Sequence, residues 1–253
     1  MSKRIAALLV LVLLLCCAAP LAQGDVSVGS KVTFGNYPQT MRGFRGSASP
    51  EPIRWLVLAV EGDKALLLSE QALAGKDYNS PDHFLYEVTW ETCTLRAWLN
   101  NEFLNEAFSS REQQAIIPAN LQNPGYESGG FVVSGGNDTT DKVFILSPDE
   151  AEKYLPTEAS RRCYPTEYAE SNGAYIGWSY YEDDSKADSD SGNSDDDKER
   201  CIWWLRAPGP IGHYAAACET WGEIDRWGEY VAKEGFAVRP AVWVSVSALT
   251  AGR

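Results

Sequence analysis

The chain of 253 residues contains only two histidines, His83 and His213. It also has no His-Glu-x-x-His, Cys-x-x-Cys or Gly-x-Ser-x-Gly motif. Such motifs bind metals or present a serine nucleophile, and any serine or cysteine triad here would depend on one of two imidazoles. The sequence therefore disfavours zinc and triad chemistry. Carboxylates are abundant, so a glycosidase-like pair of acids stays open.

Basic residues are scarce, with 22 Lys and Arg against 35 Asp and Glu and a formal net charge of −13. A nucleic-acid-binding domain needs a basic face to neutralise phosphates. We therefore expect no nucleic-acid partner and no attraction to an anionic lipid surface.

No apolar run reaches the ~20 residues that span a bilayer. The run from Ile5 to Leu15 has eleven residues and follows two basic ones. This pattern predicts a signal peptide over residues 1–22 and an exported protein, secreted or held at the cell envelope. Lipidation at Cys16 or Cys17 and an uncleaved anchor are the alternatives, so membrane contact is expected only through the leader or a lipid.

Cysteines beyond the leader number four, and an even number in an exported chain favours disulfides. Three pairings are possible. We expect Cys201 to pair with Cys218, because Cys201 would begin one strand and Cys218 would end the next, and this leaves Cys93 for Cys163.

Strand signals near both termini predict one mixed α+β domain over residues 28–248. The apolar runs Ile53–Val60 and Lys64–Ser69 flank a Glu-Gly-Asp turn and predict a hairpin covered on both faces. Residues 142–146 predict another strand. We expect residues 201–206 and 236–244 to pair with each other and to extend the antiparallel sheet that the hairpin begins.

Helical signals are short and well bounded. Between residues 92 and 107 apolar side chains recur at three- and four-residue steps, which predicts a helix. Capping boxes at Ser109 and Ser147 predict two more helices, ending near Ile117 and Tyr154.

Two polar segments predict long surface loops. Residues 120–141 are rich in Gly, Asn and Ser, and residues 182–200 form an acidic insertion with almost nothing apolar to bury, which predicts disorder. Within it Asp188 and Asp190 offer oxygen ligands to Ca²⁺, although an EF-hand's spacing and terminal Glu are missing. We therefore expect no cofactor unless Ca²⁺ binds at that loop.

Aromatic residues crowd the segment from residue 203 to residue 230. Trp203 and Trp204 lie in an apolar run that predicts a strand, so their side chains would point to opposite faces. One could fill the core while the other faces a partner sheet or a ligand. Trp221 and Trp227 stand among glycines and charged residues, as in a ligand-facing loop. The candidate ligand-binding residues are Trp204, Arg206, Trp221, Trp227 and Tyr230.

Arg206 and Arg239 each interrupt an apolar strand. A buried arginine needs a carboxylate partner or carbonyl acceptors. One interpretation is a buried ion pair that sets strand register; the other is an anchor for an anionic ligand.

Eight short motifs occur in order along the chain. They are Phe34-Gly-x-Tyr-Pro-Gln39, Arg54-Trp-Leu-Val-Leu58, Leu66-Leu-Leu-Ser69, Leu95-Arg-x-Trp-Leu-Asn100, Phe103-x-x-x-Ala-Phe108, Val143-Phe-Ile-Leu-Ser147, Trp203-Trp-Leu-Arg-x-Pro-Gly209 and Val238-Arg-Pro-Ala241. Together they resemble a bacterial family of extracytoplasmic domains catalogued as domain of unknown function 6273, over roughly residues 28–245.

The resemblance implies no particular activity. The family's ending is similar to the close of C-type-lectin-like folds, an architecture shared with formylglycine-generating enzymes, so by analogy it implies a C-type-lectin-like mixed fold. We predict a non-catalytic surface module that binds a glycan, a peptide or another protein at the cell envelope. The alternative is an enzyme, either a formylglycine-generating-like oxidase using Cys201 and Cys218 or a carbohydrate-active enzyme.

Overall fold

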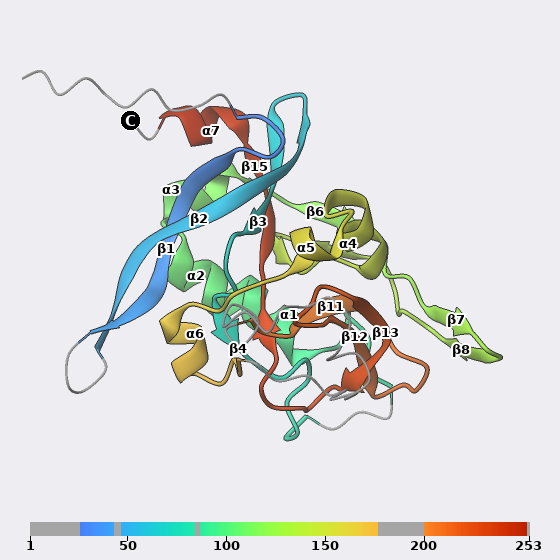
Figure 1. Ribbon diagram of the computed structural model, residues 1–253. Coiled ribbons are helices and arrows are strands. Elements are labelled where there is room, and N and C mark those ends of the chain that lie inside the picture. Colours follow the sequence, from blue (N-terminus) through green and yellow to red (C-terminus); the bar gives the residue numbers. More distant parts are fainter. Residues whose placement is uncertain (1–25, 43–46, 84–86, 177–199, 252–253) are drawn as a thin grey trace, which may run out of the picture.

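The computed structural model describes residues 26–42, 47–83, 87–176 and 200–251 (Figure 1). The predicted leader and nearly all of the acidic insertion, including Asp188 and Asp190, lie outside these residues. No helix in the described ranges combines the length and the apolar character that a membrane crossing requires.

A six-stranded antiparallel sheet joins the first strands of the chain to its last one (Figure 1). Its path runs through β1 (Lys31–Arg42), β2 (Ser47–Glu61), β3 (Lys64–Ser69), β15 (Ala241–Ser245) and β10 (Val143–Phe144), and β5 (Ile116–Ile117) also pairs with β15. The predicted β2–β3 hairpin is confirmed. Cover on both faces holds for β3 but not for β2, where Arg54 and Val60 are exposed. β3 pairs in turn with β15, with Leu66 opposite Trp243. Strands from both ends of the sequence thus share one sheet, and the fold class is α+β.

A five-stranded sheet contains the tryptophan-rich strand. Its order is β13 (Ile224–Tyr230), β12 (Tyr214–Cys218), β11 (Trp203–Pro208), β14 (Ala237–Val238) and β4 (Ala74–Gly75). The predicted pairing of residues 201–206 with residues 236–244 is confirmed where Trp203 of β11 lies opposite Ala237 of β14, and the two strands are parallel. β11 belongs to this second sheet, so the expectation that it extends the sheet of the N-terminal hairpin is wrong. Pro240 separates β14 from β15, and a proline cannot donate to a ladder. The chain therefore changes sheets at this point.

Short helices lie beside the sheets. Their bounds are α1 (Thr94–Trp98), the π-turn η1 (Leu99–Phe103), α2 (Leu104–Ala107), α3 (Ser110–Ala115), α4 (Pro148–Tyr154), α5 (Glu158–Arg161), α6 (Glu167–Ser171) and α7 (Val246–Ala251). α1, η1 and α2 follow one another without a break, as the apolar spacing predicts. α3 and α4 begin at the predicted capping boxes of Ser109 and Ser147. Local sequence signals thus decide where these helices start.

The segment 120–141 is more ordered than the long loop that its composition predicts. β6 (Ala119–Leu121) pairs with β9 (Thr139–Asp141), and β7 (Tyr126–Ser128) with β8 (Phe131–Val133) forms a hairpin that projects from the body (Figure 1). Gly129 and Gly130 have φ of 60° and 88°, the left-handed backbone that a two-residue hairpin turn requires. Two glycines in a polar segment were the signal for this turn.

Two predicted elements end earlier than expected. The strand predicted at residues 142–146 shortens to β10, and the helix from Ser109 stops at Ala115. Residues 116–117 then pair with β15 as β5. This pairing gives the main-chain N–H and C=O groups of two apolar residues hydrogen-bond partners at the edge of the sheet.

One hydrophobic cluster runs through both sheets. It contains four fully buried tryptophans, which are Trp55, Trp90, Trp203 and Trp204. Each of their indole N–H groups donates to a main-chain carbonyl or a carboxylate at 2.7–3.1 Å. The indoles therefore fill the core without leaving a buried donor unpaired.

Candidate functional site

Two of the predicted ligand-binding residues belong to the core. Trp204 is fully buried, and its ring centroid lies 4.2 Å from that of Phe236. Arg206 is 1% exposed and forms an ion pair with Glu150 at 2.7 Å. Because β11 is covered along its whole length, neither side chain has a face left for a ligand. We correct the predicted role of Trp204 and Arg206 to a structural one.

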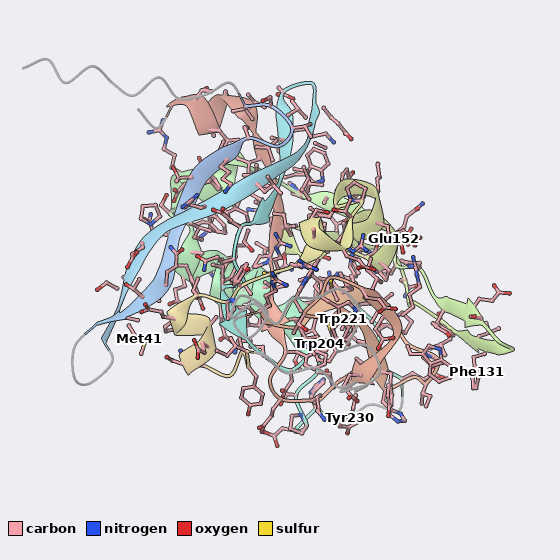
Figure 2. All side chains as sticks on the ribbon, viewed as in Figure 1. Met41, Phe131, Glu152, Trp204, Trp221 and Tyr230 are labelled. Carbon is pink, nitrogen blue, oxygen red and sulfur yellow. The ribbon has the colours of Figure 1, made fainter. Side chains whose placement is uncertain are left out.

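The other three candidates lie on β13 or just before it, and each has different contacts. Trp221 is half-buried, and its indole N–H donates to Glu223 at 2.9 Å. Trp227 is 55% exposed and meets Phe131 edge-to-face, with ring centroids 5.9 Å apart. Figure 2 shows Trp221, Phe131 and Tyr230 at separate points of the molecule. The predicted residues therefore do not converge on one site.

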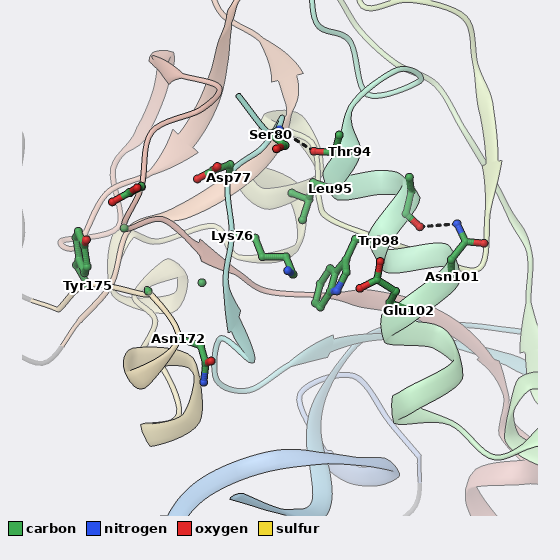
Figure 3. A pocket seen from close by; sticks show the side chains of 15 residues that line it. Lys76, Asp77, Ser80, Thr94, Leu95, Trp98, Asn101, Glu102, Asn172 and Tyr175 are labelled. Atoms are coloured by element: carbon green, nitrogen blue, oxygen red, sulfur yellow. Dashed lines mark hydrogen bonds between the residues drawn. The ribbon is translucent and has the colours of Figure 1, made fainter. Parts of the chain in front are cut away.

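A pocket of about 670 Å³ lies beside the α1–η1 run (Figure 3). Trp98 and Tyr175 lie on its opposite sides, with Lys76 between them. We call it the Trp98–Tyr175 pocket. Its polar side chains are Lys76, Asp77, Ser80, Thr94, Asn101, Glu102, Asn172 and Glu234.

A second hollow of about 910 Å³ lies between α3, α7 and β1. Its one aromatic lining residue in the described chain, Phe34, is buried. In the first pocket, by contrast, Tyr175 is 47% exposed. The Trp98–Tyr175 pocket is therefore the better candidate for a site that recognises a ligand by ring stacking.

Trp98 is positioned by the anchoring of α1. The helix begins at Cys93, whose Sγ accepts a hydrogen bond from the Arg96 main-chain N–H at 3.4 Å. The Arg96 side chain then pairs with the buried carboxylate of Asp141 at 2.7 Å. Trp98, the last residue of α1, thus extends from a helix that is fixed at its start and along its side.

Backbone contacts hold the opposite wall. The Lys76 main-chain N–H donates to the Phe236 carbonyl at 3.1 Å, and the Lys76 carbonyl accepts from the Trp204 indole at 2.8 Å. The Tyr175 N–H donates to the Gly235 carbonyl at 2.9 Å. A Cβ at Gly235, where φ is +99°, would come within 2.3 Å of the Tyr175 ring. Glycine is therefore required for the ring to lie against this strand.

The lining is net negative, with three carboxylates and one ammonium group among its side chains. Burial, and next the charge of Glu234, raise the pKa of Asp77, while Lys76 acts in the opposite direction. The Lys76 Nζ lies 4.8 Å from the centroid of the Trp98 ring, a cation–π distance. The pocket can thus offer hydrogen-bond acceptors, one donor cation and an exposed ring to a polar ligand.

The described cysteines are four buried free thiols, and the structure does not form the expected pairs. β12 places Cys218 opposite Trp203, whereas the thiol of Cys201 donates to the Cys163 main-chain carbonyl at 3.5 Å. Cys93 lies elsewhere and donates to the Trp90 carbonyl at 3.4 Å.

Metal ligands do not gather in the part of the chain that the structure describes, where no group of three or more His, Cys, Asp or Glu side chains could hold an ion. The loop on which we expected Ca²⁺ lies outside that part.

Sequence reasoning missed the pocket because its residues come from four separate segments. Trp98 belongs to the apolar repeat of a predicted helix, which indicates a core position. Asp77 and Glu234 are two acids among 35 in the chain. The one available signal was local: Tyr175 follows the Asn-Gly turn at residues 172–173, which places an aromatic ring beside an exposed turn.

The matched protein family covers the whole pocket. The family described as domain of unknown function (DUF6273) matches residues 62–246. This range contains β3, the last two strands β14 and β15, and every residue that lines the pocket. No curated protein and no solved structure matches the chain. Because the match extends over well more than half of the sequence, the chain belongs to the DUF6273 family.

Proposed function

We propose that this chain is a non-catalytic binding module whose ligand, a glycan, occupies the Trp98–Tyr175 pocket. The observation that carries the proposal is the exposed Tyr175 ring on the side of the pocket opposite Trp98, in a lining of amides, hydroxyls and carboxylates. A sugar presents an apolar ring face and a rim of hydroxyl groups. An aromatic plate with convergent polar groups complements both.

The rigidity of the walls supports this proposal. Trp98 and Tyr175 are held by main-chain hydrogen bonds and by the Arg96–Asp141 ion pair, so little ordering is needed when a ligand arrives. Preorganisation of this kind improves affinity because fewer side chains lose freedom on binding. Asn101, which also lines the pocket, donates to the Ala97 carbonyl at 2.6 Å, and this hydrogen bond fixes its amide (Figure 3).

The finer architecture and the location are part of the same proposal. We propose a C-type-lectin-like fold, supported by the pairing of the N-terminal hairpin with β15 and by a second sheet that carries long connections. We also propose an exported protein at the cell envelope, supported by the basic and apolar leader pattern of residues 1–22.

A carbohydrate-active enzyme is the second candidate. Asp77 and Glu234 face the same pocket, and burial together with the Glu234 charge raises the pKa of Asp77. Most glycosidases use two carboxyl groups, and the general acid among them has a raised pKa. Incubation of bound glycans with the chain separates the two functions. Cleavage that stops in Asp77→Asn, with binding retained, would replace our proposal by the enzyme.

A glycan array of the intact chain tests the binding proposal, followed by titration of the best ligand. We expect Tyr175→Ala to weaken binding at least about tenfold, which corresponds to about 1.4 kcal/mol. Trp227→Ala is the matched control, because Trp227 is also an exposed aromatic but lies outside the pocket. Equal affinities of wild type and Tyr175→Ala, or a loss confined to Trp227→Ala, would refute the proposed site.

A further inference from the structure

Two buried thiols are direct neighbours in space although 37 residues separate them in the sequence. The Cys201 main-chain N–H donates to the Cys163 carbonyl at 3.0 Å, and the Cys201 thiol lies 3.5 Å from the same oxygen. The side chains are 0% and 1% exposed. A main-chain N–H···O=C hydrogen bond between two residues brings their Cα atoms to roughly 5–6 Å, within the span of a disulfide.

A buried cation lies beside these thiols. Arg239 is 3% exposed and donates to the Ser69 carbonyl at 3.0 Å, while its guanidinium carbon lies 5.2 Å from the Trp203 ring centroid. Its partners in the described part of the chain are carbonyl oxygens, so the carboxylate pair that one interpretation assigned to Arg239 does not form there.

A guanidinium without a carboxylate stabilises a neighbouring thiolate. Burial alone would raise the pKa of Cys163. The hydrogen bond from the Cys201 thiol and the charge of Arg239 outweigh burial and hold that pKa below its ordinary value.

We propose that Cys163 and Cys201 are a dithiol that oxidises to a disulfide, with Cys163 as the attacking sulfur. The oxidant is a disulfide reagent such as oxidised glutathione. The Cys163 thiolate attacks one of its sulfurs, a mixed disulfide forms and one glutathione thiolate leaves. The Cys201 thiol then loses its proton and attacks the Cys163 sulfur, and the second glutathione leaves. Two electrons and two protons thereby pass from the protein to the glutathione.

The other two cysteines remain thiols. Burial raises the pKa of Cys93 to about 12, and the same cause raises that of Cys218 to about 12. Their sulfurs lie against the carbonyls of Trp90 and Arg161, at 3.4 and 3.9 Å. Neither has the paired geometry of Cys163 and Cys201.

The disulfide would close a loop of roughly 40 residues between α5 and β11, which restricts the unfolded chain. We therefore expect reduction to lower the Tm by about 5–15 °C. Cys201→Ser should have one Tm in oxidising and reducing buffer.

Peptide mapping of the intact chain tests the pairing. Folded chain is incubated with oxidised glutathione, and reduced unfolded chain is refolded in the same buffer, so that burial of the thiols does not block exchange. Trypsin cleaves after Arg162 and Arg200, among other sites, and leaves each of the four cysteines on a different peptide. We expect a peptide pair joined through Cys163 and Cys201, lighter by two hydrogens than its reduced parts.

Variants complete the test. Cys163→Ser and Cys201→Ser should abolish the joined pair, and the control Cys218→Ser should retain it. If a serine variant fails to fold, the map of the wild-type chain still decides the pairing. A link between Cys201 and Cys218, or no link after both incubation and refolding, would overturn the proposal.

Discussion

The buried carboxyl of Glu219 makes stability depend on pH in an unusual direction. Glu219 is 4% exposed, and its Oε2 has no hydrogen-bond partner in the described residues. Burial, followed by the charges of Asp225, Glu223 and Glu229, raises its pKa from 4.5 to about 7. The folded chain therefore keeps a proton on Glu219 at a pH where the unfolded chain has released it.

The sign of the effect follows from proton linkage. Between pH 4.5 and pH 7 the folded state binds more protons at this site than the unfolded state, so stability falls as the pH rises. A pKa shift of this size corresponds to about 3 kcal/mol. That contribution is fully present below pH 4.5 and is lost as the pH passes through 7.

Glu219→Gln tests this account because glutamine is a neutral side chain of the same shape. At pH 8 we expect the variant to be more stable than wild type by about 3 kcal/mol, and at pH 4.5 the two should be nearly equal. Urea denaturation at a series of pH values gives both free energies of unfolding. Glu127→Gln is the control, since Glu127 is an exposed acid. A stability difference between wild type and Glu219→Gln that does not change with pH would refute the reasoning.

Two further predictions concern the glycine behind the Tyr175 ring and the buried ion pair of Arg206. Gly235→Ala should lower the free energy of unfolding by about 1–3 kcal/mol and weaken ligand binding, because φ is +99° and the new methyl group displaces the Tyr175 ring; denaturation and titration of the same variant check both. Arg206→Met should lower the free energy of unfolding by about 3 kcal/mol. This is near the lower end of the losses expected when a buried ion pair is broken, because Glu150 is 31% exposed. Arg226→Ala, which breaks exposed pairs only, should cost less than about 1 kcal/mol in the same urea titration. Equal losses in the two arginine variants would contradict the difference in burial.

Elements governed by local signals were predictable from the sequence. The β2–β3 hairpin follows from two apolar runs around a Gly-Asp turn. Ser147 caps the start of α4, and the Glu150 carboxylate accepts a hydrogen bond from the Ser147 main-chain N–H. The buried ion pair of Arg206 was one of the two interpretations considered for an arginine in an apolar strand. In each case a few neighbouring residues decide the structure.

Features that depend on distant contacts were not predictable. β4 and β14 are two residues long each and exist because they pair with one another across the fold. Trp203 and Trp204 do point to opposite faces in a strand, but the core covers both faces, so alternation alone could not predict that Trp204 is buried. The pocket needs the tertiary fold to bring Trp98 and Tyr175 to opposite sides of one hollow.

The central claim is that the ligand lies between Trp98 and Tyr175, and indole N–H signals in nuclear magnetic resonance spectra test it most directly. Trp98→Phe and Trp227→Phe identify the two signals by their disappearance. On addition of the best glycan from the array, the account predicts a shift of the Trp98 signal that saturates with the binding curve, while the Trp227 signal stays in place. A shift of the Trp227 signal, with the Trp98 signal unchanged, would contradict a ligand site between Trp98 and Tyr175.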